Sequence, residues 1–131
     1  MKNILRKLFR KPGFSPLQLR LLAQIRDTVD VWVAAKGYVR PLHTVDEIAA
    51  DIGLPPGQLN LYVQVRKRMS VLTWRKTLRI REAQRLLLGM PELPVSIIGE
   101  MVGIEDKSNF KRQFTQVSGM SPRAWRERHL H

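Results

Sequence analysis

A short run of polar side chains near the C-terminus offers the clearest chemistry in this sequence. The run consists of Lys107, Ser108, Asn109, Lys111 and Arg112. Lys and Arg donate hydrogen bonds to guanine O6 and N7, Asn bonds adenine, and Ser bonds bases or phosphate. Phe110, Phe114 and Val117 recur at helical spacing, which predicts a helix over 107–117 with one apolar and one polar face. The polar face suits the major groove of duplex DNA, and simple solvation is the alternative.

The balance of charge favours a polyanionic partner. The 131 residues include 23 Lys and Arg but 11 Asp and Glu, which gives a net charge of +12. A field of this sign attracts polyanions, because binding to a phosphate backbone releases condensed counterions. Charge alone leaves DNA, RNA, anionic lipid and an acidic protein as alternatives.

Residues for catalysis or metal binding follow no known pattern in the sequence. There is no Gly-rich phosphate loop and no Ser/His/Asp set. The sequence has no cysteine, and the three histidines, His43, His129 and His131, have no partner at metal-ligand spacing. We therefore expect a protein that is not an enzyme and that uses no metal and no cofactor.

The first residues form a basic arm, predicted over 1–14. Residues 1–11 interleave five Lys and Arg with apolar residues. The apolar stretch is too short and too charged for a signal peptide, and no run in the sequence approaches the roughly 20 residues that span a bilayer. As a helix the arm would suit a membrane surface. A frayed cationic arm that touches phosphates or nothing is the simpler expectation.

A helix is predicted from Ser15 to about Lys36. Ser15 and Pro16 provide an N-cap and a proline in the first turn, and Gly37 provides a stop. Residues 37–44 are expected to form a loop, and no strand pattern occurs in the sequence. The positions expected to face the core are Leu17, Leu21, Ile25, Val29 and Trp32 or Val33.

An internal repeat divides the rest of the chain into two similar halves. Ile48 and Gly53 recur as Ile98 and Gly103, at an offset of 50 residues. The pattern Met-Ser-x-x-x-Trp-Arg at 69–75 recurs at 120–126, at an offset of 51. The extra residue falls after Gly103, where a turn can absorb it. Because the register is kept on both sides, we predict two copies of one supersecondary unit.

The first copy has the features of a helix-turn-helix. Thr44 and Glu47 have the spacing of a capping box at the start of one helix. Gly53 ends that helix, and the pair Pro55–Pro56 can open the next one. Two short helices joined by three or four residues around a glycine are typical of the motif.

The second copy repeats these features with different residues. Gly103 makes the turn, and Asp106 is expected to cap the helix over 107–117. Gly99 lies four residues before the turn glycine, as Ala49 does in the first copy. A small residue is expected there because the two helices approach closely. Trp32, Trp74 and Trp125 are expected to lie in the core.

A basic helix over about 72–88 joins the two copies and ends at Gly89 and Pro91. It would span roughly 25 Å, so both units are expected to reach adjacent major grooves, about 34 Å apart. The predicted fold is all-α. Its parts are a basic arm over 1–14, a first helix-turn-helix subdomain over 15–71, a connecting helix over 72–89 and a second helix-turn-helix subdomain over 90–131.

From Thr44 to Arg128 the sequence resembles the C-terminal DNA-binding domain of AraC/XylS-type transcription regulators. In the first half the resemblance rests on Ile48, Ala49, Gly53, Leu54, Leu59, Met69, Ser70, Trp74, Arg79, Ala83, Leu86 and Leu87. In the second half it rests on Ile98, Gly103, Asp106, Phe110, Arg112, Phe114, the run Gly119–Pro122 and Arg126. It implies about seven helices and sequence-specific binding to promoter DNA, usually to activate transcription through contact with RNA polymerase.

The resemblance also assigns roles to individual residues. Base readout in the second unit falls on Lys107, Ser108, Asn109, Lys111 and Arg112. In the first unit it falls on Gly57, Asn60, Leu61 and Gln64. Contacts to the DNA backbone are expected from Arg66, Lys67, Arg68, Thr44 and Arg123. Arg68 stands where the family usually has glycine, and Arg79 is expected to have a packing or capping role.

The sequence therefore predicts a DNA-binding transcription regulator in the cytoplasm, expected to be an activator. Its partners would be double-stranded DNA, which it binds as a monomer, and RNA polymerase. The alternative is a basic protein-interaction or membrane-surface module without specific DNA readout, and RNA binding ranks third. Residues 1–43 are expected to be too short for the ligand-binding domain common in the family, so control would come from elsewhere.

Overall fold

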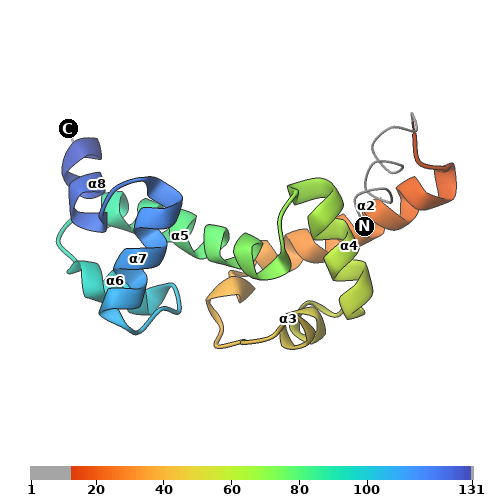
Figure 1. The fold of residues 1–131 in the computed structure, drawn as a ribbon, viewed down its shortest axis with the longest axis horizontal. Coiled ribbons are helices and arrows are strands. Elements are labelled where there is room, and N and C mark those ends of the chain that lie inside the picture. The colour runs from red at the N-terminus through yellow and green to blue at the C-terminus, as the bar shows by residue number, and fades with distance from the viewer. Residues whose placement is uncertain (1–12, 131) are drawn as a thin grey trace. The chain divides into compact units, whose positions relative to one another are not determined.

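Within residues 13–130, which are the residues that the computed structural model describes, all regular secondary structure is helical (Figure 1). The all-α prediction is confirmed, and the predicted number of about seven helices holds over this range. The α-helices are α2 (Pro16–Ala34), α3 (Val45–Ile52), α4 (Pro56–Lys67), α5 (Val71–Gly89), α6 (Val95–Met101), α7 (Lys107–Ser118) and α8 (Pro122–His129), with a 3₁₀ turn η1 (Gly37–Val39). The arm predicted over 1–14 lies almost wholly outside the described residues.

The helices belong to two compact units. Among the described residues, the first unit comprises 13–37 and 42–74, and the second comprises 38–41 and 75–130. Helix α5 begins in the first unit and continues through the second. The short segment Tyr38–Pro41 is separated in sequence from the rest of the second unit, so that unit is built from two pieces of chain.

Helix α2 starts as its sequence predicts. The Ser15 hydroxyl oxygen accepts from the Gln18 N–H at 3.2 Å, and the Gln18 side-chain oxygen accepts from the Ser15 N–H at 2.8 Å. This reciprocal pair satisfies two N–H groups that a helix start otherwise leaves unbonded. The helix ends at Ala34, two residues before the predicted end.

The predicted core face of α2 is wrong in its first two turns. Leu17 and Leu21 are 74% and 42% exposed, whereas Leu22 is buried together with Ile25, Val29 and Trp32. Leucines at 17, 19, 21 and 22 surround this part of the helix, so the apolar pattern marks no single side. Packing against α4 selects the side that contains Leu22.

The first unit is closed by two tryptophans and a hydrogen bond. Trp32 and Trp74 stack with their ring centroids 5.7 Å apart, and the Trp32 indole N–H donates to an Asp51 carboxylate oxygen at 2.8 Å. Both rings are buried, as the sequence predicts. The bond satisfies the one polar atom of a buried indole ring.

The two helix-turn-helix units share one backbone plan. Helix α3 turns into α4 at Gly53 with φ +96°, and α6 leads into α7 through Gly103 with φ +88°. Both values lie in the left-handed region, which glycine adopts without steric cost. Four residues separate α6 from α7 beyond Val102, against three between α3 and α4. The extra residue of the repeat thus lies in the turn, as predicted.

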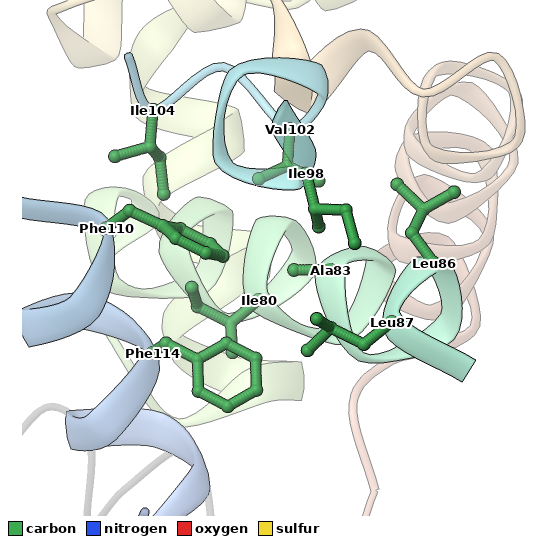
Figure 2. Packing of buried hydrophobic residues seen from close by; sticks show 9 residues of the cluster. All are labelled: Ile80, Ala83, Leu86, Leu87, Ile98, Val102, Ile104, Phe110 and Phe114. Atoms are coloured by element: carbon green, nitrogen blue, oxygen red, sulfur yellow. The ribbon is translucent and has the colours of Figure 1, made fainter. Parts of the chain in front are cut away.

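The core of the second unit joins α5 to α6 and α7. Figure 2 shows Ile80, Ala83 and Leu87 of α5 lying beneath Ile98 of α6 and Phe110 of α7. The Phe110 and Phe114 rings meet edge to face with their centroids 5.9 Å apart. Trp125 is half-buried at the edge of this cluster, where it meets Phe114 in the same way at 6.1 Å.

Residue size is matched differently in the two copies. A Cβ atom on Gly99 would lie 2.9 Å from Cγ of Phe110 and 3.1 Å from the Ile104 carbonyl oxygen. The corresponding residues of the first copy are Ala49 and Leu59, both fully buried. A methyl group beside a leucine in one copy is therefore replaced by a hydrogen atom beside a larger aromatic ring in the other.

This exchange predicts that the effect of Gly99→Ala on the free energy of unfolding depends on residue 110 and reverses when that residue is leucine. In the wild-type background, overpacking against Phe110 costs about 1–3 kcal/mol and exceeds the gain of about 1 kcal/mol in helix propensity, so stability falls. In a Phe110→Leu background the contact with the ring is removed and only the 3.1 Å approach to the Ile104 carbonyl oxygen remains, so Gly99→Ala should raise the free energy of unfolding. Urea unfolding of the four proteins in this cycle measures both effects. Equal changes in the free energy of unfolding in both backgrounds would contradict the proposed match in size between residues 99 and 110.

Candidate nucleic-acid interface

Helix α7 holds its polar side chains on an exposed face. The Asp106 carboxylate accepts from the Asn109 N–H at 2.7 Å and so caps the helix start, as predicted. Phe110 and Phe114 are buried and fix which side of α7 faces the core. Four residues of the predicted readout set are exposed on α7, namely Lys107, Ser108, Lys111 and Arg112, and the fifth, Asn109, is half-buried.

Two of these side chains, Asn109 and Arg112, are joined by a hydrogen bond. An Arg112 guanidinium N–H donates to the Asn109 amide oxygen at 2.6 Å, and the Gln113 amide donates to the same oxygen at 3.1 Å. Residues three and four apart are neighbours on a helix, so this spacing was a signal in the sequence. The pattern of residue types predicts Asn109 and Arg112 as separate readers, whereas the structure joins them by a hydrogen bond.

A buried arginine sets the turn that leads into α7. Arg79 of α5 is 8% exposed, and its guanidinium donates to three backbone carbonyl oxygens. The acceptors are those of Tyr38, of Arg40 at 2.8 Å and of Gly103 at 3.3 Å. The predicted packing or capping role of Arg79 is confirmed. The side chain links α5, the segment Tyr38–Pro41 and the helix-turn-helix turn within the second unit.

The same cluster explains why residue 103 is glycine. A Cβ atom on Gly103 would collide with the Val39 carbonyl oxygen and would lie 3.1 Å from the Arg79 guanidinium carbon. Burial, together with repulsion from Arg75, lowers the pKa of Arg79 to about 10. The guanidinium therefore stays protonated at neutral pH and keeps all its donors.

The corresponding face of α4 in the first unit is uncharged. Gly57, Leu61 and Gln64 are exposed and Asn60 is half-buried. In the register of the repeat, Leu61 occupies the place of Arg112 and Asn60 the place of Lys111. The four predicted readers of the first unit thus lie together on one helix, but they offer only amide groups for hydrogen bonds from side chains to bases.

Positive charge in the first unit collects at the end of α4. Arg66, Lys67 and Arg68 are all exposed, and the Arg66 guanidinium carbon lies 6.0 Å from the centroid of the Phe14 ring. Arg68 is the C-cap residue and has φ +58°. The equivalent C-cap of α7 is Gly119, with φ +79°. An L-residue thus occupies a left-handed position that the other copy gives to glycine.

The remaining two predicted backbone contacts are Thr44, the N-cap of α3, and Arg123, on α8. The Thr44 hydroxyl oxygen accepts from the Glu47 N–H at 3.1 Å and caps α3. The Glu47 carboxylate completes the start of the helix by accepting from the His43 N–H at 3.0 Å, rather than from Thr44 as in a capping box. Arg123 lies on α8 and forms an exposed ion pair with Glu127 at 3.6 Å.

A second arginine with a structural role closes the far end of α5. The Arg126 guanidinium donates to the carbonyl oxygens of Leu87 at 3.0 Å, Leu93 at 2.8 Å and Met90 at 3.3 Å. These bonds satisfy carbonyls that a helix C-terminus leaves free. Arg126 belongs to the Trp-Arg pattern that the sequence repeats. Its carbonyl acceptors are distant in the sequence, so the pattern alone predicts no role for this residue.

Within residues 13–130, no three His, Asp or Glu side chains are grouped so that they could hold a metal ion. Over the same range, none of the helices combines the length and the apolar character needed to cross a membrane.

Sequence comparison decides the family. A family model described as a helix-turn-helix domain matches residues 48–128, which is more than half of the chain. The chain belongs to the AraC-type helix-turn-helix family. Members of this family are DNA-binding transcription regulators rather than enzymes, so double-stranded DNA is the partner that the family implies.

Two relatives of this AraC-type chain are the arabinose operon regulatory proteins of Salmonella typhimurium and Escherichia coli. Each is 33% identical to it over 82 residues, which is 63% of this chain. The match covers 29% of the Salmonella protein and 28% of the Escherichia coli protein. The chain thus spans less than a third of the length of these relatives.

Solved structures of similar fold support the AraC-type architecture. The C-terminal domain of AraT, a response regulator from Geobacillus stearothermophilus, has a TM-score of 0.64 and 24% identity, over 89% of this chain and 88% of that one. The C-terminal domain of the response regulator yesN from Fusobacterium nucleatum has a TM-score of 0.58 and 21% identity, over 86% and 99%. At these identities the likeness concerns the fold alone.

The three carbonyl bonds predict a large effect for Arg79→Ala. The variant leaves three backbone acceptors of the second unit without their donor, so the free energy of unfolding should fall by about 2–4 kcal/mol. Arg79→Lys should recover only part of the loss, because an ammonium lacks the planar fork that reaches three acceptors. Chemical denaturation followed by circular dichroism measures the effect. Arg81→Ala, at an exposed position of the same helix, is the control and should change stability by less than about 0.5 kcal/mol.

Proposed function

We propose that this protein is a sequence-specific regulator of transcription that reads duplex DNA mainly with α7. The observation that carries the proposal is the exposed set on the second helix of the second helix-turn-helix. The buried Phe110 and Phe114 orient this helix so that its charged and polar side chains face solvent. Lys107, Ser108, Asn109, Lys111 and Arg112 carry the donors that distinguish base edges in the major groove.

In this proposal the two units have different tasks. The first unit contributes Gly57, Asn60, Leu61 and Gln64, which make weaker base contacts in an adjacent major groove. Its main contribution is to hold the DNA backbone through Arg66, Lys67 and Arg68, with Thr44 at the start of α3. Arg123 on α8 adds a backbone contact from the second unit. Phosphate contacts of this kind set the register of the protein on the duplex but carry no direct sequence information. The uncharged face of α4 supports this division.

The biological role that we propose is activation of transcription in the cytoplasm. Two relatives are named as regulatory proteins of an operon, and we extend transcription regulation of this kind to the present chain. We further propose that it binds DNA as a monomer, because two readers on one chain supply two half-site contacts. RNA polymerase would be the protein partner of the bound activator.

A selection from a random DNA library tests the proposed readout. The wild-type chain should enrich one duplex and bind it at least about a thousandfold more tightly than a scrambled duplex at physiological salt. Arg112→Ala should cost about 1–3 kcal/mol on the selected duplex and relax the base preference at one position. Titration of both duplexes by fluorescence anisotropy measures the affinities.

The same measurements separate DNA reading from simple charge attraction. A basic interaction module would show a steep loss of affinity with salt but no preference between the selected and scrambled duplexes. Equal binding to both duplexes by the wild-type chain would therefore contradict the proposal. An Arg112→Ala variant with an unchanged base preference would remove Arg112 from the readout set.

The left-handed Arg68 predicts opposite changes in stability and in DNA binding. Arg68→Gly should raise the free energy of unfolding by about 0.5–1 kcal/mol, because a left-handed Cβ costs about 1–2 kcal/mol and glycine entropy offsets part of it. It should also weaken binding to the selected and scrambled duplexes alike and reduce the salt slope by about one. Urea unfolding and anisotropy at several salt concentrations measure the two effects.

A matched control exists in the same unit. Lys36 also has a left-handed φ, +57°, and Lys36→Gly removes the same charge as Arg68→Gly. It should stabilise the fold to a similar degree with little effect on the affinity for DNA. Equal losses of affinity in the two variants would mean that net charge, rather than a phosphate contact at Arg68, determines binding.

A further inference from the structure

Asn109 lies at the centre of a small side-chain network on the proposed reading face. Its backbone N–H is held by the Asp106 carboxylate at 2.7 Å, so the residue is fixed at the first turn of α7. Its amide oxygen accepts from Arg112 at 2.6 Å and from Gln113 at 3.1 Å. The side chain is half-buried, whereas Arg112 beside it is exposed.

This network occupies the atom that Asn109 would use to read a base. An amide oxygen has two acceptor sites, and two donors already point at this one. Bidentate recognition of adenine by asparagine uses the amide oxygen as an acceptor and the amide nitrogen as a donor. Direct readout by Asn109 would therefore require at least one of its bonds, to Arg112 or to Gln113, to be given up.

The bond has a clear advantage for Arg112. An arginine side chain has many rotamers, and ordering it on binding costs free energy. The bond to Asn109 uses one of five N–H donors of the guanidinium, so enough donors remain for a bidentate pair with guanine O6 and N7. The first copy has Gln58 and Leu61 at these two places, so it has no arginine to hold.

We propose that Asn109 is a positioning residue that holds Arg112 ready to contact guanine, and not an independent reader of bases. This inference rests on the proposed function of α7 in DNA readout. Asn109 then acts on specificity only through the guanidinium of Arg112. The duplex enriched by the wild-type chain from a random library is the probe for the test.

A double-mutant cycle distinguishes positioning from reading. Asn109→Ala should weaken binding to the selected duplex by about threefold to tenfold, the cost of ordering one long side chain. In the Arg112→Ala background the same change should have no further effect, because nothing is left to position. The non-additivity identifies the coupling between the two residues. Anisotropy titrations of the wild type, both single variants and the double variant supply the cycle.

A matched pair shows whether the coupling is specific to Arg112. Lys111 is exposed on the same helix but, two residues from Asn109, points to a different side of it. The losses caused by Asn109→Ala and Lys111→Ala should therefore multiply. Far-UV circular dichroism and thermal unfolding should show an intact fold in every variant. The Asp106 cap survives in Asn109→Ala, because its donor is the backbone N–H.

The base preference of an Asn109→Asp variant is a measurement that a simple loss of packing would not alter. A carboxylate keeps the oxygen that accepts from Arg112 but removes the amide donor needed for adenine. A positioning residue predicts lower affinity for every duplex, from the added negative charge, with the base preference of the wild type retained. A direct reader predicts a changed preference at its own base position.

The possible outcomes separate this inference from the function on which it rests. Equal binding of the selected and scrambled duplexes by the wild type overturns the proposed function, and the inference with it. Clear preference by the wild type together with multiplicative losses for Asn109→Ala and Arg112→Ala overturns the inference alone. Tighter binding by Asn109→Ala would also overturn it, since it would mean that Asn109 withholds Arg112 from DNA.

Discussion

The second unit depends on a single cation buried among backbone carbonyls. Arg79 donates from α5 to Tyr38, Arg40 and Gly103, which come from two segments far apart in the sequence. Because the acceptors are main-chain atoms, the guanidinium fixes where the backbone runs rather than where another side chain lies. The turn at Gly103 is one of the fixed points, and α7 begins four residues later. The bond from Arg79 to Gly103 thus helps to set where α7, with its proposed base-reading residues, lies within the second unit.

Around that constraint, the repeat separates what the motif requires from what each copy is free to vary. Both copies keep a left-handed glycine at the turn and a small residue four places earlier. These positions are set by the close approach of two helices. The exposed positions are under no such constraint, and there the copies differ most, with Leu61 in one and Arg112 in the other. Even the buried positions differ in a compensated way, as the exchange of Ala49 and Leu59 for Gly99 and Phe110 illustrates.

The features that the sequence predicted well are local. Caps at Ser15 and Asp106, the glycine turns and the helical spacing of Phe110 and Phe114 depend on residues within a few places of one another. The failures concern contacts between distant segments. Leu21 and Leu22 are equally apolar, and only packing against α4 decides that Leu22 is buried.

The segment after α2 is the other failure of this kind. The sequence predicts a loop over 37–44, yet these residues contain the turn η1 and the buried Tyr38. Part of the segment belongs to the second unit because Arg79 binds its carbonyls. Carbonyl acceptors leave no mark in a sequence, since every residue has one. The resemblance to a known family could place Arg79 in a structural role, but not name its partners.

Specificity in so basic a chain requires rigidity more than charge. A net charge of +12 favours every duplex alike, because the phosphate backbone is the same in all sequences. Discrimination needs donors that form hydrogen bonds with one base edge and not with the others. A mobile arginine can adapt to correct and incorrect base edges alike. In the second unit the edge-to-face aromatic core, the Asp106 cap and the Asn109 bond each remove freedom from α7 or from Arg112. In the first unit, three exposed cations lie at the C-terminal end of α4. Within residues 13–130, its four predicted readers form no comparable network of side-chain hydrogen bonds. Charge without fixed geometry suits a unit that holds the backbone, and fixed geometry with moderate charge suits a unit that reads bases.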